Sequence, residues 1–209
     1  MFNRSKLQKK EGVQPTDLEE EAAKILSAFE TSADGELRAA LKFVFINSVE
    51  MVEYEQADRS AAKYVLIKIP YRSLAFYKKV AAKVIDHLEG QFKWPVIVIA
   101  NRTIQSKRAK THASQKRPRS RTLKAVHNAT LHDICVPSSI VGRRQRFSIT
   151  DGSTEKVHLD PLDKVLVEEK IDAMAHAYQR LTTHAISIEF AKPTSFQKKK
   201  LEQLRQKNE

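Results

Sequence analysis

Apolar residues in the first 41 positions recur every three to four residues, which is the spacing of amphipathic helices. A first helix is predicted over residues 16–29, because Thr16 and Glu19 fit a capping box and further acidic residues follow in the first turn. A second, shorter helix is predicted over residues 35–41, with Asp34 near its N-terminus. The chain therefore begins its periodic part with two consecutive helices.

Two β-rich segments follow the helices. Residues 43–53 and 63–69 are rich in Phe, Val, Ile and Tyr, and the second segment stops at Pro70. The polar residues 56–60 between them have the composition of a turn. We therefore expect an antiparallel hairpin.

A third helix and a third strand complete this part of the chain. The helical spacing returns over residues 74–88, between Ser73 as a cap and Gly90 as a stop. Residues 96–100 are continuously apolar, which is typical of a strand that is covered on both faces.

The second half of the chain repeats the alternation of helices and strands. The pattern predicts a helix over residues 122–133, a hairpin over 141–159 with its turn at 151–153, a long helix over 162–183 and a strand over 185–190. The apolar residues that the long helix would turn inward are Val165, Ile171, Met174, Tyr178 and Leu181.

These elements predict an α/β (α+β) fold, in which helices pack on a mixed or antiparallel sheet and a second portion contains a β-hairpin and helices. We expect either one extended domain or two subdomains joined around residues 101–135. The predicted segments are a flexible arm at 1–14, a helical and ββαβ portion at 15–100, a basic extended loop at 101–121, an α-ββ-α-β portion that packs with the first at 122–190, and a charged helical tail at 191–209.

The charge of the chain is concentrated in one segment. The 209 residues include 37 Lys and Arg against 25 Asp and Glu, which gives a net charge of +12. Residues 101–147 contain twelve basic residues and a single acid, Asp133, so this segment holds eleven of those net charges while the remainder is close to balance. Like charges at this density repel unless a polyanion neutralises them. The twelve candidate binding residues are Arg102, Lys107, Arg108, Lys110, Lys116, Arg117, Arg119, Arg121, Lys124, Arg143, Arg144 and Arg146.

Composition excludes several classes of protein. A hydrophobic content of 41% excludes a wholly disordered chain, and Cys135 as the single cysteine excludes an internal disulfide framework. The apolar run at 96–100 is too short to cross a bilayer, which takes about 20 residues, and no secretory signal is visible. We expect a soluble, intracellular protein.

The sequence offers little chemistry for catalysis. It contains neither GxxxxGK[ST] nor GxGxxG, and its acids lie away from the basic segment. His127 and His132 are five positions apart, which is not the i, i+4 spacing of a metal-binding pair, and a core-edge role fits His127. Cys135 is expected to be a buried, inert thiol. We therefore predict no enzyme activity, no cofactor and no metal.

The basic segment suits phosphate contacts better than base stacking. Between Pro95 and Arg146 there is no Phe, Tyr or Trp, whereas proteins that read single strands stack bases on aromatic side chains. The stretch at 116–121 suits bidentate arginine contacts to phosphate. We expect such a segment to be mobile when free and to order on a folded nucleic acid. A solvated loop or a nuclear-import signal is also basic, but an import signal needs only about 5–8 residues. DNA packaging, RNA chaperoning and ribonucleoprotein assembly all remain open at this point.

Specific motifs narrow the choice among these three functions. The sequences KRPRSRTLKAVHN (116–128), ATLHDICVPSSIVGRRQRF (129–147) and KVHLD (156–160) closely resemble the eukaryote-specific small-subunit (40S) ribosomal protein seven family, which is unrelated to the bacterial-type protein of that number. PVIVIANRTI (95–104) is similar to a strand and basic turn of the same family. The resemblance also covers the order of the N-terminal helices and hairpin.

The resemblance implies a structural constituent of the cytosolic small ribosomal subunit. It implies binding to small-subunit rRNA, eukaryotic expansion regions included, and to neighbouring ribosomal proteins, with a contribution to rRNA maturation and passage through the nucleolus. It implies no small-molecule substrate and no membrane partner. The arginines that match family motifs are Arg117, Arg119, Arg121, Arg143 and Arg144, whereas Lys107, Arg108 and Lys110 are assigned on charge and loop context alone.

The sequence also departs from the family. The turn at 56–60 is usually glycine-rich in the family and has no glycine here, and residues 191–209 extend beyond the usual end. The tail could contact rRNA or a neighbouring protein, or be a free solvated helix. The leading alternative function is a regulatory adaptor whose basic segment binds acidic protein partners, and an RNA-modifying or RNA-cleaving enzyme is the weakest.

Overall fold

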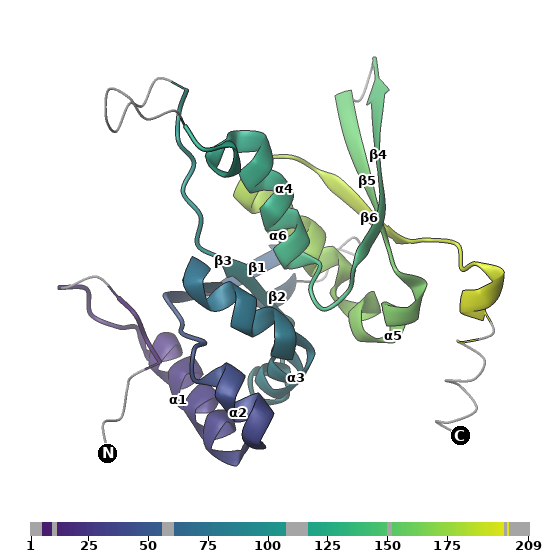
Figure 1. Cartoon of the computed structure of the whole chain (residues 1–209). Coiled ribbons are helices and arrows are strands. Elements are labelled where there is room, and N and C mark those ends of the chain that lie inside the picture. Colours follow the sequence, from purple (N-terminus) through teal and green to yellow (C-terminus); the bar gives the residue numbers. More distant parts are fainter. Residues whose placement is uncertain are drawn as a thin grey trace. The chain divides into compact units, whose positions relative to one another are not determined.

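The protein forms two compact units, which meet in the sequence between Val136 and Pro137. The computed structural model describes residues 6–9, 12–55, 61–107, 117–149, 152–198 and 200 (Figure 1). The elements follow the order predicted from the sequence, and the α/β class is confirmed. The helix predicted over 122–133 belongs to the first unit, whereas the sequence grouped it with the second portion.

The first unit contains a three-stranded sheet in the order β1-β2-β3. Its strands are β1 (Ser48–Glu55), β2 (Ala61–Ile69) and β3 (Val96–Ala100), and its helices are α1 (Asp17–Ser32), α2 (Gly35–Leu41), α3 (Leu74–Phe92) and α4 (Leu123–Ile134), with 3-10 turns η1 (Tyr71–Ser73) and η2 (Arg119–Arg121). The β1–β2 hairpin is antiparallel, as predicted, and β3 pairs with β2 in parallel after the α3 crossover. Every residue of β3 is buried, as its continuous apolar run predicts.

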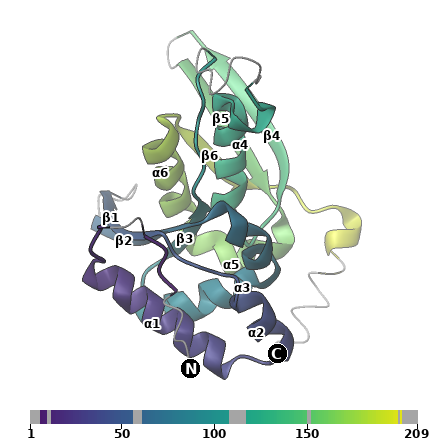
Figure 2. The same cartoon turned by 60° about the vertical axis from the view of Figure 1, so that its left-hand side comes forward.

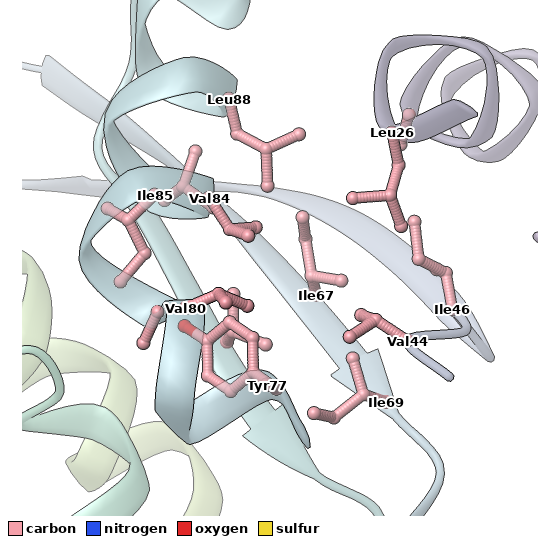
Figure 3. Packing of buried hydrophobic residues seen from close by; sticks show 14 of the residues in the cluster. Leu26, Val44, Ile46, Ile67, Ile69, Tyr77, Val80, Val84, Ile85 and Leu88 are labelled. Atoms are coloured by element: carbon pink, nitrogen blue, oxygen red, sulfur yellow. The ribbon is translucent and has the colours of Figure 1, made fainter. Parts of the chain in front are cut away.

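Helices α1, α2 and α3 share one core with one face of this sheet (Figure 2). Figure 3 shows Leu26 of α1 beside Ile46 and near Ile67 of β2, with Val84 and Leu88 of α3 on the other side of Ile67. The period of 2 along the strands and the helical period along α3 place these side chains inward. Helix α4 lies against β3.

The N-terminus of the first unit differs from the prediction. Residues 43–47 are not part of β1, and Ile46 instead bridges to Leu7, with backbone bonds of 2.8 Å from Gln8 N to Ile46 O and from Ile46 N to Lys6 O. Lys6 is buried, donates to Leu41 O at 2.8 Å and forms an ion pair with Glu30. Residues 6–9 are therefore docked on the unit rather than free in the predicted flexible arm.

The end of α3 also differs from the prediction, which placed the stop at Gly90. The helix continues through Gly90 to Phe92, and Lys93 closes it in the left-handed conformation at φ 58°. The Lys93 N–H donates to Glu89 O at 2.8 Å, and the Glu89 carboxylate accepts the Val96 N–H at 3.0 Å. Contacts to the following strand, rather than the flexibility of glycine, thus set where the helix stops.

The second unit contains the sheet β4-β5-β6. Strands β4 (Ile140–Ser148) and β5 (Gly152–Leu159) form the predicted antiparallel hairpin, and β6 (Ile186–Phe190) pairs in parallel with β5. Residue 151 of the predicted turn lies outside the described residues, as do the turn at 56–60 and the tail beyond residue 200.

The single long helix predicted over 162–183 is wrong. The segment is divided into η3 (Pro161–Asp163), α5 (Lys164–Val167), η4 (Glu168–Lys170) and α6 (Ile171–Thr182). Val167 has φ −125°, and the following 3-10 turn changes the phase of the apolar stripe. Val165, predicted to point inward, is therefore 90% exposed, while Val167 is fully buried. Across the described residues, no helix is both long and apolar enough to span a membrane.

Candidate nucleic-acid interface

Nine of the twelve candidate binding residues lie in described parts of the structure. The first unit carries Arg102, Lys107, Arg117, Arg119, Arg121 and Lys124, and the second carries Arg143, Arg144 and Arg146. Arg108, Lys110 and Lys116 fall outside the described residues, so their predicted role stays a prediction.

Hydrogen bonds hold the two ends of the basic loop together. The loop leaves β3 at Asn101, whose N–H donates to Ile69 O at 2.8 Å. Further along, the Gln105 N–H donates to Arg121 O at 3.0 Å, and the Arg117 guanidinium donates to Gln105 O at 3.1 Å. Residues near 105 therefore lie beside residues 117–121, which gathers their side chains in one region.

Helix α4 begins in the same region. Its N-cap Thr122 accepts from the Ala125 N–H at 3.4 Å and donates to Arg119 O at 2.8 Å. The first turn of α4 carries no acidic side chain. The positive end of the helix dipole therefore adds to the field of Arg121 and Lys124 instead of being neutralised.

One cation of the loop has an internal counter-ion. Arg102 forms an ion pair with Asp133, which lies in the last turn of α4 and is 2% exposed. The second carboxylate oxygen of Asp133 lies 3.7 Å from Lys78 Nζ, and its first oxygen also accepts the Ala100 N–H at 3.2 Å. The side chain of Arg102 is 12% exposed, and its guanidinium lies 5.7 Å from the centre of the Tyr71 ring. Arg102 is thus held by internal contacts at the point where the loop begins.

A buried tyrosine lies close to this pair. Burial raises the pKa of the Tyr77 hydroxyl well above its usual value, and the charges of Asp133 and Glu89 add to that shift. The hydroxyl oxygen has no hydrogen-bond partner among the described residues. Tyr77 therefore stays neutral and contributes to the core rather than to the chemistry of the interface.

In the hairpin of the second unit, one candidate arginine also has an internal counter-ion. Arg143 forms an ion pair with Glu155, whose second oxygen accepts from Arg143 Nη2 at 2.8 Å. Across the sheet, Lys156 Nζ lies 2.6 Å from Glu189, and this hydrogen bond lowers the pKa of the Glu189 carboxyl. The sequence predicted neither of these internal pairs.

The remaining candidate cations are exposed. Within the described ranges they have no carboxylate or other side-chain partner, unlike Arg102, Arg117 and Arg143. They are Lys107, Arg119, Arg121, Lys124, Arg144 and Arg146. Such side chains carry the positive field of the surface outward, because no neighbouring anion cancels it.

Sequence reasoning missed one feature in each of the two units. It placed Phe147 and Ile149 within the predicted hairpin over 141–159 and gave them no further role, yet both are exposed. It also gave no role to Asp133, although a single acid in a strongly cationic segment is a signal of an internal counter-ion. Cys135 is buried as predicted, and burial raises the pKa of its thiol to about 12. Among the described residues, no cluster of His, Cys, Asp and Glu could hold a metal.

Comparison with known proteins agrees with the resemblance noted in the sequence. The family model described as ribosomal protein S7e matches residues 6–190. The small ribosomal subunit protein eS7z of Arabidopsis thaliana is 34% identical over 186 residues, which cover 88% of this chain and 94% of the relative. The eS7 proteins of Avicennia marina and Drosophila melanogaster are 36% and 34% identical, and the matches cover 88% and 89% of this chain and 95% and 94% of the relatives. The matched region covers most of both units and every described candidate residue, and the chain therefore belongs to the ribosomal protein S7e family.

Proposed function

We propose that this protein binds folded small-subunit rRNA through the exposed cations of its basic loop, of the start of α4 and of the β4–β5 hairpin. It is a structural, non-enzymatic constituent of the small subunit of the cytosolic ribosome, with rRNA and other ribosomal proteins as partners. The observation that carries the proposal is the set of six exposed cations without internal partners among the described residues.

The arrangement favours contacts to the phosphate backbone. Arg119, Arg121 and Lys124 project from a short turn and the first turn of a helix, so their separations are set by backbone geometry. Arg102 and Arg117 are committed to internal contacts and act by holding the shape of the loop. Phosphate contacts of this kind position a protein on folded RNA without reading its sequence.

Three finer roles belong to the same proposal. We infer contact with eukaryotic expansion regions, a contribution to subunit assembly and rRNA maturation, and passage through the nucleolus. They are supported by the density of positive charge between residues 101 and 147. Release of the counter-ions of rRNA by these side chains favours binding to rRNA.

The test is co-sedimentation with small subunits on sucrose gradients at rising salt, together with direct binding to a small-subunit rRNA transcript. In the double variant Arg119→Ala/Arg121→Ala, affinity should fall and the slope of log K against log salt should shrink by about 2. The matched control is Lys79→Ala/Lys83→Ala, which removes the same charge from exposed positions on α3.

The control variant should bind nearly as the wild type does. An equal loss in both variants would show that only net charge matters and would overturn the assignment to the loop. Tighter binding to an acidic peptide than to the rRNA transcript would favour an adaptor that binds acidic proteins and would overturn the proposal.

A further inference from the structure

The outer end of the β4–β5 hairpin extends beyond its third strand. Strand β5 pairs with β4 along its whole length, but β6 pairs with β5 only from Glu155 to Leu159. In the described structure, residues 146–148 and 152–154 therefore form a ribbon of two strands alone, and Figure 1 shows these ends running past β6. An isolated two-stranded ribbon is marginally stable in water, so a partner at this end would stabilise it.

One face of the ribbon is cationic and lacks a spare anion. Arg144 and Arg146 share this face because side chains alternate along a strand, and Arg144 lies directly opposite Lys156. Like charges in that register destabilise a sheet. The nearby carboxylate of Glu189 is occupied by Lys156, and His158 beside it adds no negative charge. The described residues therefore supply no anion for the two arginines.

The other face carries an exposed aromatic side chain. Phe147 is 75% exposed and stands opposite Ser153, and Ile149 next to it is fully exposed. Arg143 on the same face is neutralised by Glu155. An aromatic side chain on one face and two cations without an internal anion on the opposite face thus lie within four consecutive residues of β4, the outer strand of the sheet.

We infer that an RNA strand crosses β4 at this end of the hairpin, so that Phe147 stacks on an unpaired base at one face while Arg144 and Arg146 contact neighbouring phosphates at the opposite face. The inference rests on the proposed function and adds a mode of contact to it. The partner must offer a flat apolar face on one side of β4 and anions on the other, and a single-stranded RNA segment with an unpaired base offers both. An acidic protein surface offers only the anions, and an apolar protein surface only the contact area.

The experiment uses the full chain and two synthetic RNA stem-loops, one with a single bulged 2-aminopurine and one fully paired. The wild type should bind the bulged probe more tightly and quench its fluorescence. Phe147→Ala should weaken binding to the bulged probe about 5- to 150-fold, the range for loss of one stacked base. It should leave the paired probe and the salt slope unchanged. Arg144→Ala/Arg146→Ala should instead reduce the slope by about 1.5 to 2.

Conservative variants separate stacking from plain apolar contact. Phe147→Tyr should keep the quenching, whereas Phe147→Leu should lose it, because leucine has no aromatic face. Val165→Ala removes another exposed apolar side chain of the same unit and should change neither probe. Thermal melting by circular dichroism checks that all variants are folded, as expected for such exposed positions.

The outcomes distinguish the two proposals. If the wild type binds both probes with a steep salt slope but Phe147→Ala behaves identically, the stacking inference fails and the proposed function stands. If Phe147→Leu keeps wild-type binding to the bulged probe, apolar contact without an aromatic ring is sufficient, and the stacking inference fails as well. If the wild type binds no RNA in a salt-dependent way, the proposed function itself fails.

Discussion

Asp133 accepts from both the Arg102 guanidinium and the Ala100 N–H, and this joins the last turn of α4 to the end of β3. The only acid among residues 101–147 thus lies inside the protein and holds the point from which the basic loop departs. Its role is to fix the loop, and its negative charge is not displayed to the solvent.

Replacing Asp133 by alanine should therefore weaken RNA binding although it removes a negative charge. Arg102 and the Ala100 N–H would lose their acceptor, and the free energy of unfolding should fall by about 2–4 kcal/mol. The double variant with Arg102→Ala should be less destabilised than the sum of the single variants. Urea unfolding of the four proteins of the cycle measures the coupling. Additive effects would contradict the role given to the pair.

Contacts of Glu19 at the N-terminus of α1 predict how the stability of the protein depends on pH. The Glu19 carboxylate accepts the Thr16 N–H at 2.8 Å and pairs with Lys9. Burial raises its pKa, but the bonds to Lys9 and Thr16 outweigh burial and leave the pKa below its usual value. A lowered folded pKa contributes stability above the unfolded value of about 4.3, and this contribution is lost as the pH falls.

Glu19→Gln should accordingly cost about 1 kcal/mol at pH 7 and progressively less below about pH 4.5. The exposed Glu21→Gln on the same helix is the control and should change stability little at any pH. Guanidinium unfolding at several pH values measures both variants. A deficit that stays constant down to pH 3 would contradict the ion pair as its cause.

The burial of Cys135 predicts that its thiol reacts slowly with alkylating reagents. Its side chain is buried, and burial raises its pKa to about 12, so little reactive thiolate is present at neutral pH. Alkylation by iodoacetamide at pH 8 should be about 1,000-fold or more slower in the folded protein than in denaturant. Mass spectrometry of quenched samples follows the reaction. Rapid labelling under native conditions would show that the end of α4 opens readily.

Gly90 offers a stabilising substitution. It lies in the interior of α3 and is exposed, and a Cβ added there would meet no atom within 4 Å. Gly90→Ala should raise the free energy of unfolding by about 0.5–1 kcal/mol, because alanine loses less backbone freedom in a helix. Thermal unfolding checks this change. A loss of stability would instead support the capping role that the sequence alone predicted for Gly90.

Much of the fold could be predicted because local patterns and tertiary packing agree. The capping box at Thr16, the apolar run of β3 and the hydrophobic patterns of both hairpins each predict the observed element. The pattern failed where packing overrides it. A regular stripe predicted Val165 inward, but the departure of Val167 from helical geometry changes the phase.

The candidate site was predictable in composition but not in detail. Charge counting located the segment and its basic residues. It could not separate Arg102 and Arg143, which have internal carboxylate partners, from Arg144, which has none among the described residues. The paired residues are 31 positions apart in the sequence for Arg102 and 12 positions apart for Arg143. Composition gives no information about such contacts.

Because hydrogen bonds fix both ends of the basic loop, the length of the segment between them can change. Asn101 is bonded to Ile69, and Gln105 is bonded to both Arg117 and Arg121, so the segment between departs and returns at neighbouring fixed points. Doubling the length of such a segment adds only about 0.6 kcal/mol of closure entropy. The same scaffold can therefore accept a longer or shorter insert at this position at a small cost in stability and without a change to its core.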